Sequence, residues 1–370
     1  MPSFDIIKRS EPARTFRVAS IVDTYDLQSN KVTEHFSGSF ELPEEWNVGL
    51  IVGRSGTGKT TIARHLFGDN VISQYEYTHE CFMDDMPKDC SVKEICEALC
   101  SVGFASPPSW LKSYDVLSNG EKMRCDLARA MLEKRELFCF DEFTSVVDRN
   151  VAHIGSLAMQ KAIRRKNRKF VAVTCHYDVQ EWLMPDWVFN TDTMQFQVLD
   201  LETQKKNKPT INIDIYQLKS TEEKKRCWNI FRKYHYLSDS FNMTADAYIC
   251  TANGEIAGFT SVLHFMHPRV KDIKRIHRTV VLPDYQGVGI GTQLNEWVAK
   301  KYTKKSFRVR NVTSSPQMIT AMNKSKKWEC IRKGRLRTGS CGKDLKHIKR
   351  TISSNRITCT FEYIGGCNDG

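Results

Sequence analysis

Residues Gly53-Arg54-Ser55-Gly56-Thr57-Gly58-Lys59-Thr60 decide the fold of the first half of this 370-residue chain. They match the pattern G-x-x-x-x-G-K-[ST] and directly follow the apolar strand candidate 48–52, which is the context that a phosphate-binding loop requires. In such a loop backbone N–H groups surround the phosphates of a nucleotide, Lys59 contacts the β and γ phosphates, and Thr60 ligates Mg²⁺. The residues expected to hold ATP are Gly53, Ser55, Gly56, Gly58, Lys59, Thr60 and Thr61. A glycine turn with a chance lysine is the alternative.

A second apolar strand candidate, 137–140, ends in the carboxylates Asp141 and Glu142. Such a pair is often a solvated turn. After a phosphate loop, however, we interpret Asp141 as a Mg²⁺ ligand and Glu142 as the residue that polarises the attacking water. A third strand candidate, 170–174, follows, and helix-like stretches separate the three. This alternation predicts an α/β fold with a mostly parallel sheet covered by helices.

The segment Leu117-Ser118-Asn119-Gly120-Glu121-Lys122 opens a helix expected over 123–133. Ser118 and Glu121 form the capping-box pattern S-x-x-E, which any helix can use. The segment also resembles the L-S-G-G-Q signature of the ABC ATPase family. This resemblance implies that Ser118 and Gly120, at a helix N-terminus, bind the γ-phosphate of ATP held by a second copy of the chain.

Two further motifs extend the ABC resemblance over about residues 15–200. Residues 144–148 resemble the D-loop, and His176 resembles the switch histidine that contacts the γ-phosphate. Asn119 departs from the signature, and no glutamine between residues 78 and 158 supplies a Q-loop. The short span between the phosphate loop and the signature predicts a small helical subdomain, which favours a soluble ABC protein over a transporter subunit. Tyr25 is the expected adenine-stacking residue.

The polar and basic stretch 201–210 ends in Pro209-Thr210 and predicts a linker between domains 1–205 and 209–370. Beyond it we expect a strand, a helix, a hairpin with the turn Ala252-Asn253-Gly254-Glu255, a strand, a glycine-rich loop, a helix, a strand and a helix. The expected ranges are 211–218, 222–236, 276–282, 292–302, 307–312 and 317–325 for the elements outside the hairpin.

Residues 280–291 read V-V-L-P-D-Y-Q-G-V-G-I-G and join the expected strand to the expected helix. Alternate glycines before a helix N-terminus expose consecutive N–H groups and suit a pyrophosphate. A glycine turn in another α/β domain is the plain alternative, and the preceding hairpin argues against a Rossmann nucleotide site. The run resembles motif A of the GNAT acetyltransferases, Q/R-x-x-G-x-G/A, and the resemblance covers about 211–365. It implies an α+β domain that holds acetyl-CoA through Val281, Gln286, Gly287, Val288, Gly289, Ile290, Gly291 and Ser315.

GNAT chemistry passes an acyl group directly from a thioester to an amine, so it requires a base and a donor that steadies the leaving thiolate. His235 and Tyr236 end the expected first helix of this domain, where acceptor-site residues lie in the family, and they are the candidate catalytic residues. His277 lies in the expected central strand. All three also have plausible structural roles. Ser314 and Ser315 follow a strand whose end can meet the CoA arm.

The acceptor must be sought in the surface chemistry, since the net charge of +12 favours acidic partners. A basic segment at 324–350 contains Trp328 and His347, which suits phosphate contact with base stacking, and a second basic run covers 161–169. Charge runs are also ordinary solvated faces. Residues 264–328 resemble the phage Mom DNA-modification acyltransferases, which are related to GNAT.

We therefore expect an ATPase and acyl-CoA N-acyltransferase that acylates a nucleic-acid base or an RNA and forms an ATP-dependent dimer around the polymer. Two alternatives stay open. One is a nucleic-acid-binding ATPase whose GNAT module only binds CoA. The other is an acetyltransferase acting on protein or a small molecule, whose activity would lose little with added salt.

Cysteine content and hydropathy favour a cytoplasmic protein. No apolar run approaches the roughly 18 residues that span a bilayer, and the first residues lack the apolar stretch of a signal peptide. The 13 cysteines are scattered and are expected to be reduced thiols. A loose set that could bind zinc fits no known spacing and consists of Cys330, Cys341, His347, Cys359 and Cys367.

Overall fold

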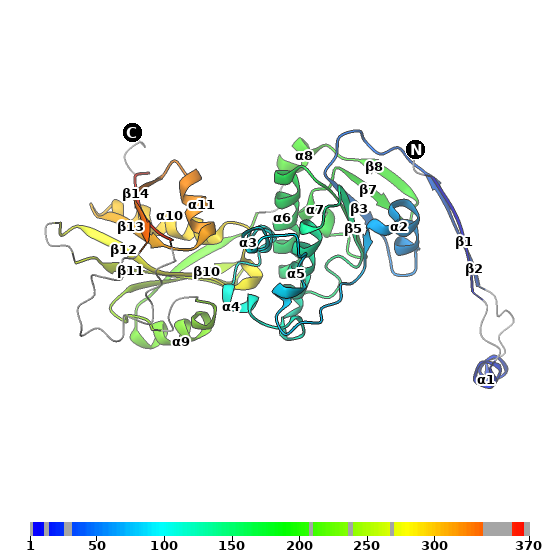
Figure 1. The fold of residues 1–370 in the computed structure, drawn as a ribbon, viewed down its shortest axis with the longest axis horizontal. Helices are drawn as coiled ribbons and strands as arrows, with labels where there is room; N and C mark the ends of the chain where they lie inside the picture. Colours follow the sequence, from blue (N-terminus) through cyan, green and yellow to red (C-terminus); the bar gives the residue numbers. More distant parts are fainter. Residues whose placement is uncertain are drawn as a thin grey trace. The chain divides into compact units, whose positions relative to one another are not determined.

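The computed structural model describes residues 3–10, 15–25, 32–206, 210–235, 240–266, 270–335 and 357–365. The chain divides into two compact units (Figure 1). The first contains residues 1–75, 134–148 and 159–209, and the second contains 76–133, 149–158 and 210–370. The segment 76–133, which carries the signature-like helix, therefore groups with the C-terminal residues. The domain boundary expected between 205 and 209 stays a prediction.

The first unit is built on a six-stranded sheet in the order β4-β5-β6-β3-β7-β8. The five strands from β4 to β7 are parallel, and β8 is antiparallel to β7. The central strand β3 is buried at every position and reads V-G-L-I-V, the continuous apolar run of a strand covered on both faces. The bounds are β3 Val48–Val52, β4 Val71–Ile72, β5 Leu137–Phe140, β6 Lys169–Thr174, β7 Trp187–Asn190 and β8 Gln195–Val198. The expected parallel α/β arrangement is confirmed.

Several short helices and a two-stranded ribbon complete the first unit. These are α1 Phe16–Thr24, α2 Lys59–Phe67, η1 Gly68–Asn70, α7 Val179–Leu183, α8 Leu201–Lys206, and the strands β1 Ser3–Ser10 and β2 Val32–Ser39; α6 Arg149–Lys166 contributes its second half. Helix α8 occupies part of the expected linker. It forms because the Asp200 carboxylate accepts hydrogen bonds from the backbone N–H groups of Glu202 and Thr203 at 3.2 and 2.9 Å.

The second unit contains a seven-stranded sheet in the order β14-β15-β13-β12-β11-β10-β9. All pairs are antiparallel except β12 with β13. The expected hairpin joins β10 to β11, and its turn residues Asn253 and Gly254 have φ of 51° and 87°, as a type I′ turn requires. The bounds are β9 Ile213–Leu218, β10 Asp246–Ala252, β11 Glu255–His264, β12 Ile273–Val281, β13 Arg308–Thr313, β14 Trp328–Arg335 and β15 Ile357–Tyr363.

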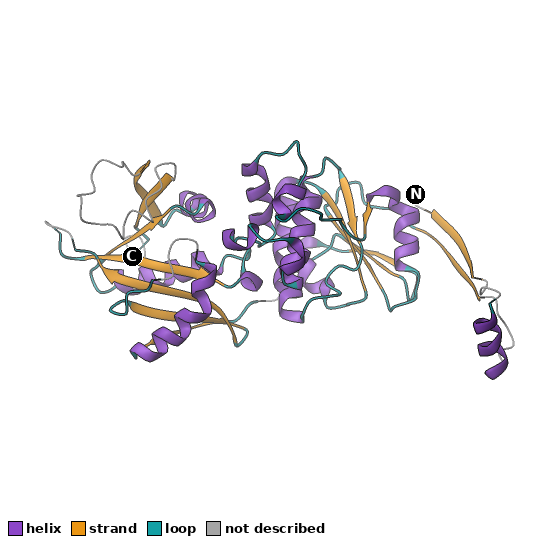
Figure 2. Ribbon diagram, turned by 60° about the horizontal axis from the view of Figure 1, so that its bottom comes forward, coloured by secondary structure: helices purple, strands orange, loops and turns teal. Residues whose placement is uncertain are grey.

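Helices pack on both faces of this sheet (Figure 2). Ala247 and Ile249 of β10 pack with Trp228 of α9, whereas Tyr248 between them packs with Val298 of α10. Because side chains alternate along a strand, α9 and α10 lie on opposite faces. The helices of this unit are α3 Val92–Ser101, α4 Pro107–Trp110, α5 Asn119–Leu132, α9 Thr221–Phe231, α10 Ile290–Thr303 and α11 Pro316–Lys324, with the 3-10 turns η2 Phe82–Asp85, η3 Tyr114–Val116, η4 Arg232–Tyr234 and η5 Pro283–Tyr285.

From β9 to α11, the elements of the second unit follow the order expected from the sequence. The helix expected over 222–236 is α-helical only as far as Phe231 and continues as η4, and Tyr236 lies outside the described residues. Within the described ranges, no helix has both the length and the apolar character needed to cross a bilayer.

Candidate functional site

Three neighbouring parallel strands of the first unit end at one edge of the sheet, and predicted site residues follow each of them. The strand β3 leads into the phosphate loop at Gly53, β5 leads into Asp141, and β6 leads to His176. The strand β6 lies between β3 and β5. Because parallel strands have their carboxyl ends at the same edge, the fold brings these three motifs together.

The phosphate loop joins a buried strand to the N-terminus of a helix. Gly58 is the N-cap of α2, and the first turn of α2 contains no acidic residue. Ser55 and Gly56 are exposed, and Lys59 Nζ donates to the carbonyl oxygen of Arg54 at 2.7 Å, so its ammonium group lies over the loop. Exposed backbone, an uncompensated helix N-terminus and a lysine together fit an anionic phosphate chain.

Hydroxyl and carboxylate oxygens, which Mg²⁺ prefers, lie side by side next to this loop. The Thr60 hydroxyl donates to Asp141 Oδ1 at 3.2 Å, and Asp141 is 5% exposed. Glu142 is exposed and has φ of 54°, an uncommon backbone conformation for a residue with a side chain. Its N–H donates to Asp141 Oδ1 at 3.0 Å. The two predicted metal ligands are thus neighbours, and the carboxylate of Glu142 is left to solvent.

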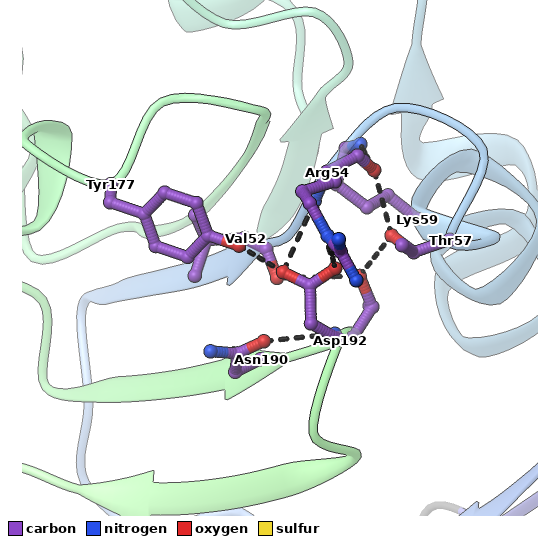
Figure 3. A network of polar contacts seen from close by, with 8 residues as sticks. Val52, Arg54, Thr57, Lys59, Tyr177, Asn190 and Asp192 are labelled. Atoms are coloured by element: carbon purple, nitrogen blue, oxygen red, sulfur yellow. Dashed lines mark hydrogen bonds and ion pairs between the residues drawn. The ribbon is translucent and has the colours of Figure 1, made fainter.

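A polar network that the sequence did not indicate connects the phosphate loop with the residue after His176 (Figure 3). Arg54 Nε donates to Asp192 Oδ1 at 3.0 Å, and the Tyr177 hydroxyl donates to Asp192 Oδ2. These bonds, that of Tyr177 first, hold the pKa of Asp192 below its usual value, and the bond to Asp192 raises the pKa of Tyr177. Arg54 and Asp192 are 138 positions apart, so no local pattern could have joined them.

The signature-like segment begins helix α5 of the second unit. Ser118 is its N-cap: its hydroxyl accepts from the N–H of Glu121 at 3.3 Å, and the Glu121 carboxylate accepts from the N–H of Ser118 at 3.0 Å. Ser118 is exposed, whereas Gly120 is buried and packs against Val151 and Asp284. The capping role of Ser118 is therefore confirmed. Contact of Ser118 and Gly120 with a nucleotide stays a prediction, as does adenine stacking by the exposed Tyr25.

In the second unit, two parallel strands part where the CoA-binding residues are predicted. Residues Ile273 to Ile276 of β12 pair with Arg308 to Asn311 of β13, but β12 continues to Val281. The strand β12 then leads through η5 to α10, and β13 leads to Ser315. The Ser315 hydroxyl is the N-cap acceptor of α11, at 3.5 Å from the N–H of Met318. Beyond these pairs β12 and β13 are no longer hydrogen-bonded to each other, and the two predicted CoA-contacting segments, the glycine-rich loop and Ser315, follow the separated strand ends.

The glycine-rich loop presents its backbone at this opening. Gly287 and Gly289 are exposed, and Gly289 is the N-cap of α10 with φ of 99°. A Cβ at Gly289 would meet no atom within 4 Å, and α10 has no acidic residue in its first turn. Val288 and Ile290 pack into the core beside Leu294 and anchor the loop. An exposed, anchored loop at a helix N-terminus fits a diphosphate.

His277 lies at an irregularity of β12. Ser261 pairs with Arg278 and Val262 pairs with Ile276, so His277 is the extra residue of a β-bulge. Its Nε2 is buried and has no hydrogen-bond partner among the described residues. Burial, followed by the charge of Arg278, lowers the pKa of His277 to about 4. The ring is therefore neutral at pH 7.

The remaining candidates for acceptor contact have mixed outcomes. His235 follows η4 and packs against Trp228 with ring centroids 5.8 Å apart, which supports a structural role beside the predicted catalytic one. Trp328 is only 5% exposed and packs against Tyr363, so the expectation that it stacks on a base is wrong. Within the second basic run, Arg164 donates to Asp186 and to the carbonyl oxygen of Met184, so this cation has protein partners.

The structure describes only some of the residues of the predicted zinc set and of the basic segment 324–350. Cys341, His347 and Cys367, and the part of the basic segment from 336 to 350, lie outside the described residues. In the part of the chain that the structure describes, no group of three or more His, Cys, Asp or Glu residues is placed to hold a metal ion.

Family models match both parts of the chain. Residues 212–317 match the acetyltransferase (GNAT) family, and residues 28–175 match the NB-ARC domain, a P-loop NTPase domain. No curated protein matches the chain.

Solved structures align with parts of it at low identity. The ribosomal-protein-S18-alanine N-acetyltransferase of Escherichia coli is 17% identical, with a TM-score of 0.30 over 41% of this chain and 94% of that one. An acetyltransferase of Bacillus subtilis in complex with CoA is 14% identical, with a TM-score of 0.28 over 41% and 97%. The ATP-binding cassette MJ0796, a dimer bound to ADP and Pi, is 13% identical, with a TM-score of 0.38 over 54% and 98%. By the two family models, the chain has a P-loop ATPase-like N-terminal region and a C-terminal region with the GNAT fold.

Proposed function

We propose that this protein is an ABC-type ATPase joined to an acyl-CoA N-acyltransferase, and that it acylates an amine of a nucleic-acid base. The observation that carries the proposal is the pair of anion cradles, each at an open helix N-terminus. One is the phosphate loop with the adjacent Thr60 and Asp141, for ATP and Mg²⁺. The other is the exposed loop at Gly289 beside the parted strands, for acetyl-CoA.

The transfer forms a bond between the acceptor nitrogen and the acyl carbon and breaks the bond from that carbon to the CoA sulfur. The acceptor nitrogen loses a proton, and the thiolate gains one. His277 is suited to take the proton, because it is neutral and its Nε2 has no hydrogen-bond partner among the described residues. His235, whose charge adds to the lowering of the His277 pKa, is the candidate that orients the acceptor. Glu142 is the candidate base for ATP hydrolysis.

Surface charge supports a nucleic-acid acceptor. The net charge is +12, and exposed cations gather at the end of α11 and along β14. They are Lys324, Lys326, Lys327, Arg332 and Lys333. Lysine and arginine contacts to phosphates supply sequence-independent affinity for DNA or RNA. A dimer closed by ATP across the exposed Ser118 would hold the polymer while the target base leaves its stack.

The direct test is mass spectrometry of nucleosides from cells that express the protein, with a Gly289→Asp variant as the control. This substitution puts a carboxylate into the diphosphate cradle at a φ of 99°. We expect an acylated nucleoside with the wild-type protein and none with the variant. Acyl-CoA-dependent label on protein or metabolites, and never on DNA or RNA, would refute the proposal. CoA binding without release of free CoA with any acceptor would identify a non-catalytic module instead.

A further inference from the structure

The back of the diphosphate loop is held by helix α5 of the same unit. Arg124 Nη1 donates to the carbonyl oxygen of Pro283 at 2.6 Å, and Arg124 Nη2 donates to that of Asp284 at 2.8 Å. The Arg124 side chain is 0% exposed. Two neighbouring carbonyl groups are thus bound by the two prongs of one guanidinium, a geometry that a lysine ammonium does not reproduce.

Gln286, the first residue of the Q-x-x-G-x-G motif, makes a second connection. Its Nε2 donates to the carbonyl oxygen of Val281 at 2.8 Å, and its Oε1 accepts from the N–H of Ala105 at 2.6 Å. One side chain therefore ties the end of β12 to the loop that follows α3. Both the oxygen and the nitrogen of the Gln286 side-chain amide are therefore hydrogen-bonded to the protein backbone.

Two glycines let the backbones meet between these two connections. A Cβ on Gly287 would lie 2.7 Å from Gly103 Cα, and a Cβ on Gly103 would lie 2.6 Å from the carbonyl oxygen of Gln286. Neither approach leaves room for a side chain. Gly289, by contrast, has open space in front of it. The loop is thus packed against protein at Gly287 and open at Gly289.

We propose that Arg124 is a positioning residue for acyl-CoA binding, and that α5 couples the ATP state to acyl-CoA affinity. The proposal rests on the proposed function, since it requires the loop to bind acyl-CoA. Hydrogen bonds from a buried charged donor fix the carbonyl groups of residues 283 and 284, and with them the turn that aims the following N–H groups at the diphosphate. The Asp284 carboxylate lies 3.7 Å from Arg124 Nη1 and offsets the guanidinium charge, so the support is the fixing of the two carbonyl groups.

The coupling follows from what else α5 carries. Its N-cap is Ser118, the exposed serine of the signature-like segment, and Arg124 lies less than two helical turns further along. ATP bound in a second copy would therefore act on the helix that supports the CoA loop. Because coupling of binding equilibria is reciprocal, acyl-CoA must change the affinity for ATP by the same factor.

The first test is titration calorimetry with CoA on the full chain. We expect Arg124→Met to weaken CoA binding about tenfold, and Arg124→Lys to give an intermediate loss, from the removal of charged hydrogen bonds. The matched control is Arg129→Met on the same helix, whose guanidinium donates to the carbonyl oxygen of Glu76 at 2.8 Å and is expected to leave the CoA affinity unchanged. Circular dichroism melting identifies variants that do not fold.

The outcomes separate the two proposals. If the wild-type protein does not bind CoA, the proposed function fails. If the wild type binds CoA and Arg124→Met and Arg124→Lys bind it equally well, the positioning role is overturned. Equal losses in the Arg124→Met and Arg129→Met variants also overturn it, because the effect is then one of helix stability.

The second test measures the coupling. In a Glu142→Gln background, which we expect to keep ATP unhydrolysed, ATP with Mg²⁺ should change the CoA dissociation constant about fivefold or more, a typical coupling between two sites. The change should disappear when Arg124→Met is added. An ATP effect that is absent in the Glu142→Gln protein, or that persists undiminished with Arg124→Met, overturns the coupling through α5.

Discussion

At the scale of single residues, His277 combines features that seldom occur together. It is the extra residue of a bulge, it packs against Phe241 near the charges of Arg278 and Arg275, and its Nε2 has no hydrogen-bond partner among the described residues. Burial and nearby positive charge both disfavour the imidazolium, so the pKa falls from its ordinary 6.5 to about 4. Bulges often serve to direct a side chain at a functional site.

We expect the pH dependence of acyl transfer to report the pKa of His277. If His277 is the base, kcat/KM rises with pH with a midpoint near 4 and is flat between pH 6 and 8, because the ring is already deprotonated there. A His277→Gln variant should lose about a hundredfold in kcat and retain its affinity for CoA. The pH profile and a CoA titration are the measurements. A midpoint near 6.5, or a variant with unchanged kcat, contradicts the assignment.

At the scale of elements, a second capping box allows the observed role of Ser118 as a helix cap to be separated from its proposed role in ATP-dependent dimerisation. The N-caps of α5 and α3, Ser118 and Ser91, both accept from the N–H of the glutamate three residues on. Replacing either serine by alanine should cost about 1 kcal/mol of stability, the usual value of an N-cap. We expect only Ser118→Ala to weaken ATP-dependent dimerisation of the Glu142→Gln protein, measured by analytical ultracentrifugation. If the Ser118→Ala and Ser91→Ala variants dimerise equally well, Ser118 acts only as a helix cap.

Helix α5 also carries a carboxyl group that should make stability depend on pH. Asp126 accepts hydrogen bonds from the hydroxyl groups of Tyr77 and Tyr114 at 2.8 and 2.7 Å, but its burial dominates and raises its pKa to about 6. The folded state therefore binds more protons than the unfolded state between about pH 4 and 6, so this group's contribution to stability falls as pH rises through that window.

We expect the stability difference between the wild type and an Asp126→Asn variant to change with pH. From pH 4 to pH 7, the wild type should lose on the order of 2 kcal/mol relative to the variant, at about 1.4 kcal/mol per unit of pKa shift. Denaturant unfolding of both proteins at several pH values measures this difference. A constant difference over the range would show that Asp126 titrates normally in the folded protein.

Local motifs predicted the parts of the fold around the two glycine-rich loops, because the phosphate loop, the Ser118 capping box and the Asn253-Gly254 turn are written in adjacent residues. The strands β3, β5 and β6 were recognisable as short apolar runs followed by polar site residues. The contact of Arg124 with Pro283 joins positions 159 apart, so no period or spacing could reveal it. Trp328 misled the sequence interpretation because an aromatic among cations has the same pattern whether it faces solvent or, as here, the core.

At the scale of the whole molecule, the excess of positive charge separates the possible acceptors. A nucleic-acid acceptor must bind through phosphates, and each phosphate neutralised by lysine or arginine releases counterions and adds a salt dependence. For about four such contacts, raising the salt from about 50 to 200 mM should lower kcat/KM for DNA or RNA roughly a hundredfold. A protein or small-molecule acceptor lacks this steep dependence.

The same titration applied to a charge variant tests where the polymer binds. Replacing the exposed Arg332 and Lys333 by glutamate should raise the KM for nucleic acid and make the salt slope shallower by about two contacts. CoA is itself an anion, so its binding also weakens with salt. The CoA dissociation constant is therefore measured over the same salt range, and its salt dependence is subtracted from that of the reaction. Replacing Lys93 and Lys112, exposed cations of the segment 76–133, by glutamate controls for total charge. A KM that responds equally to both pairs would show that net charge, and not the surface along β14, attracts the acceptor.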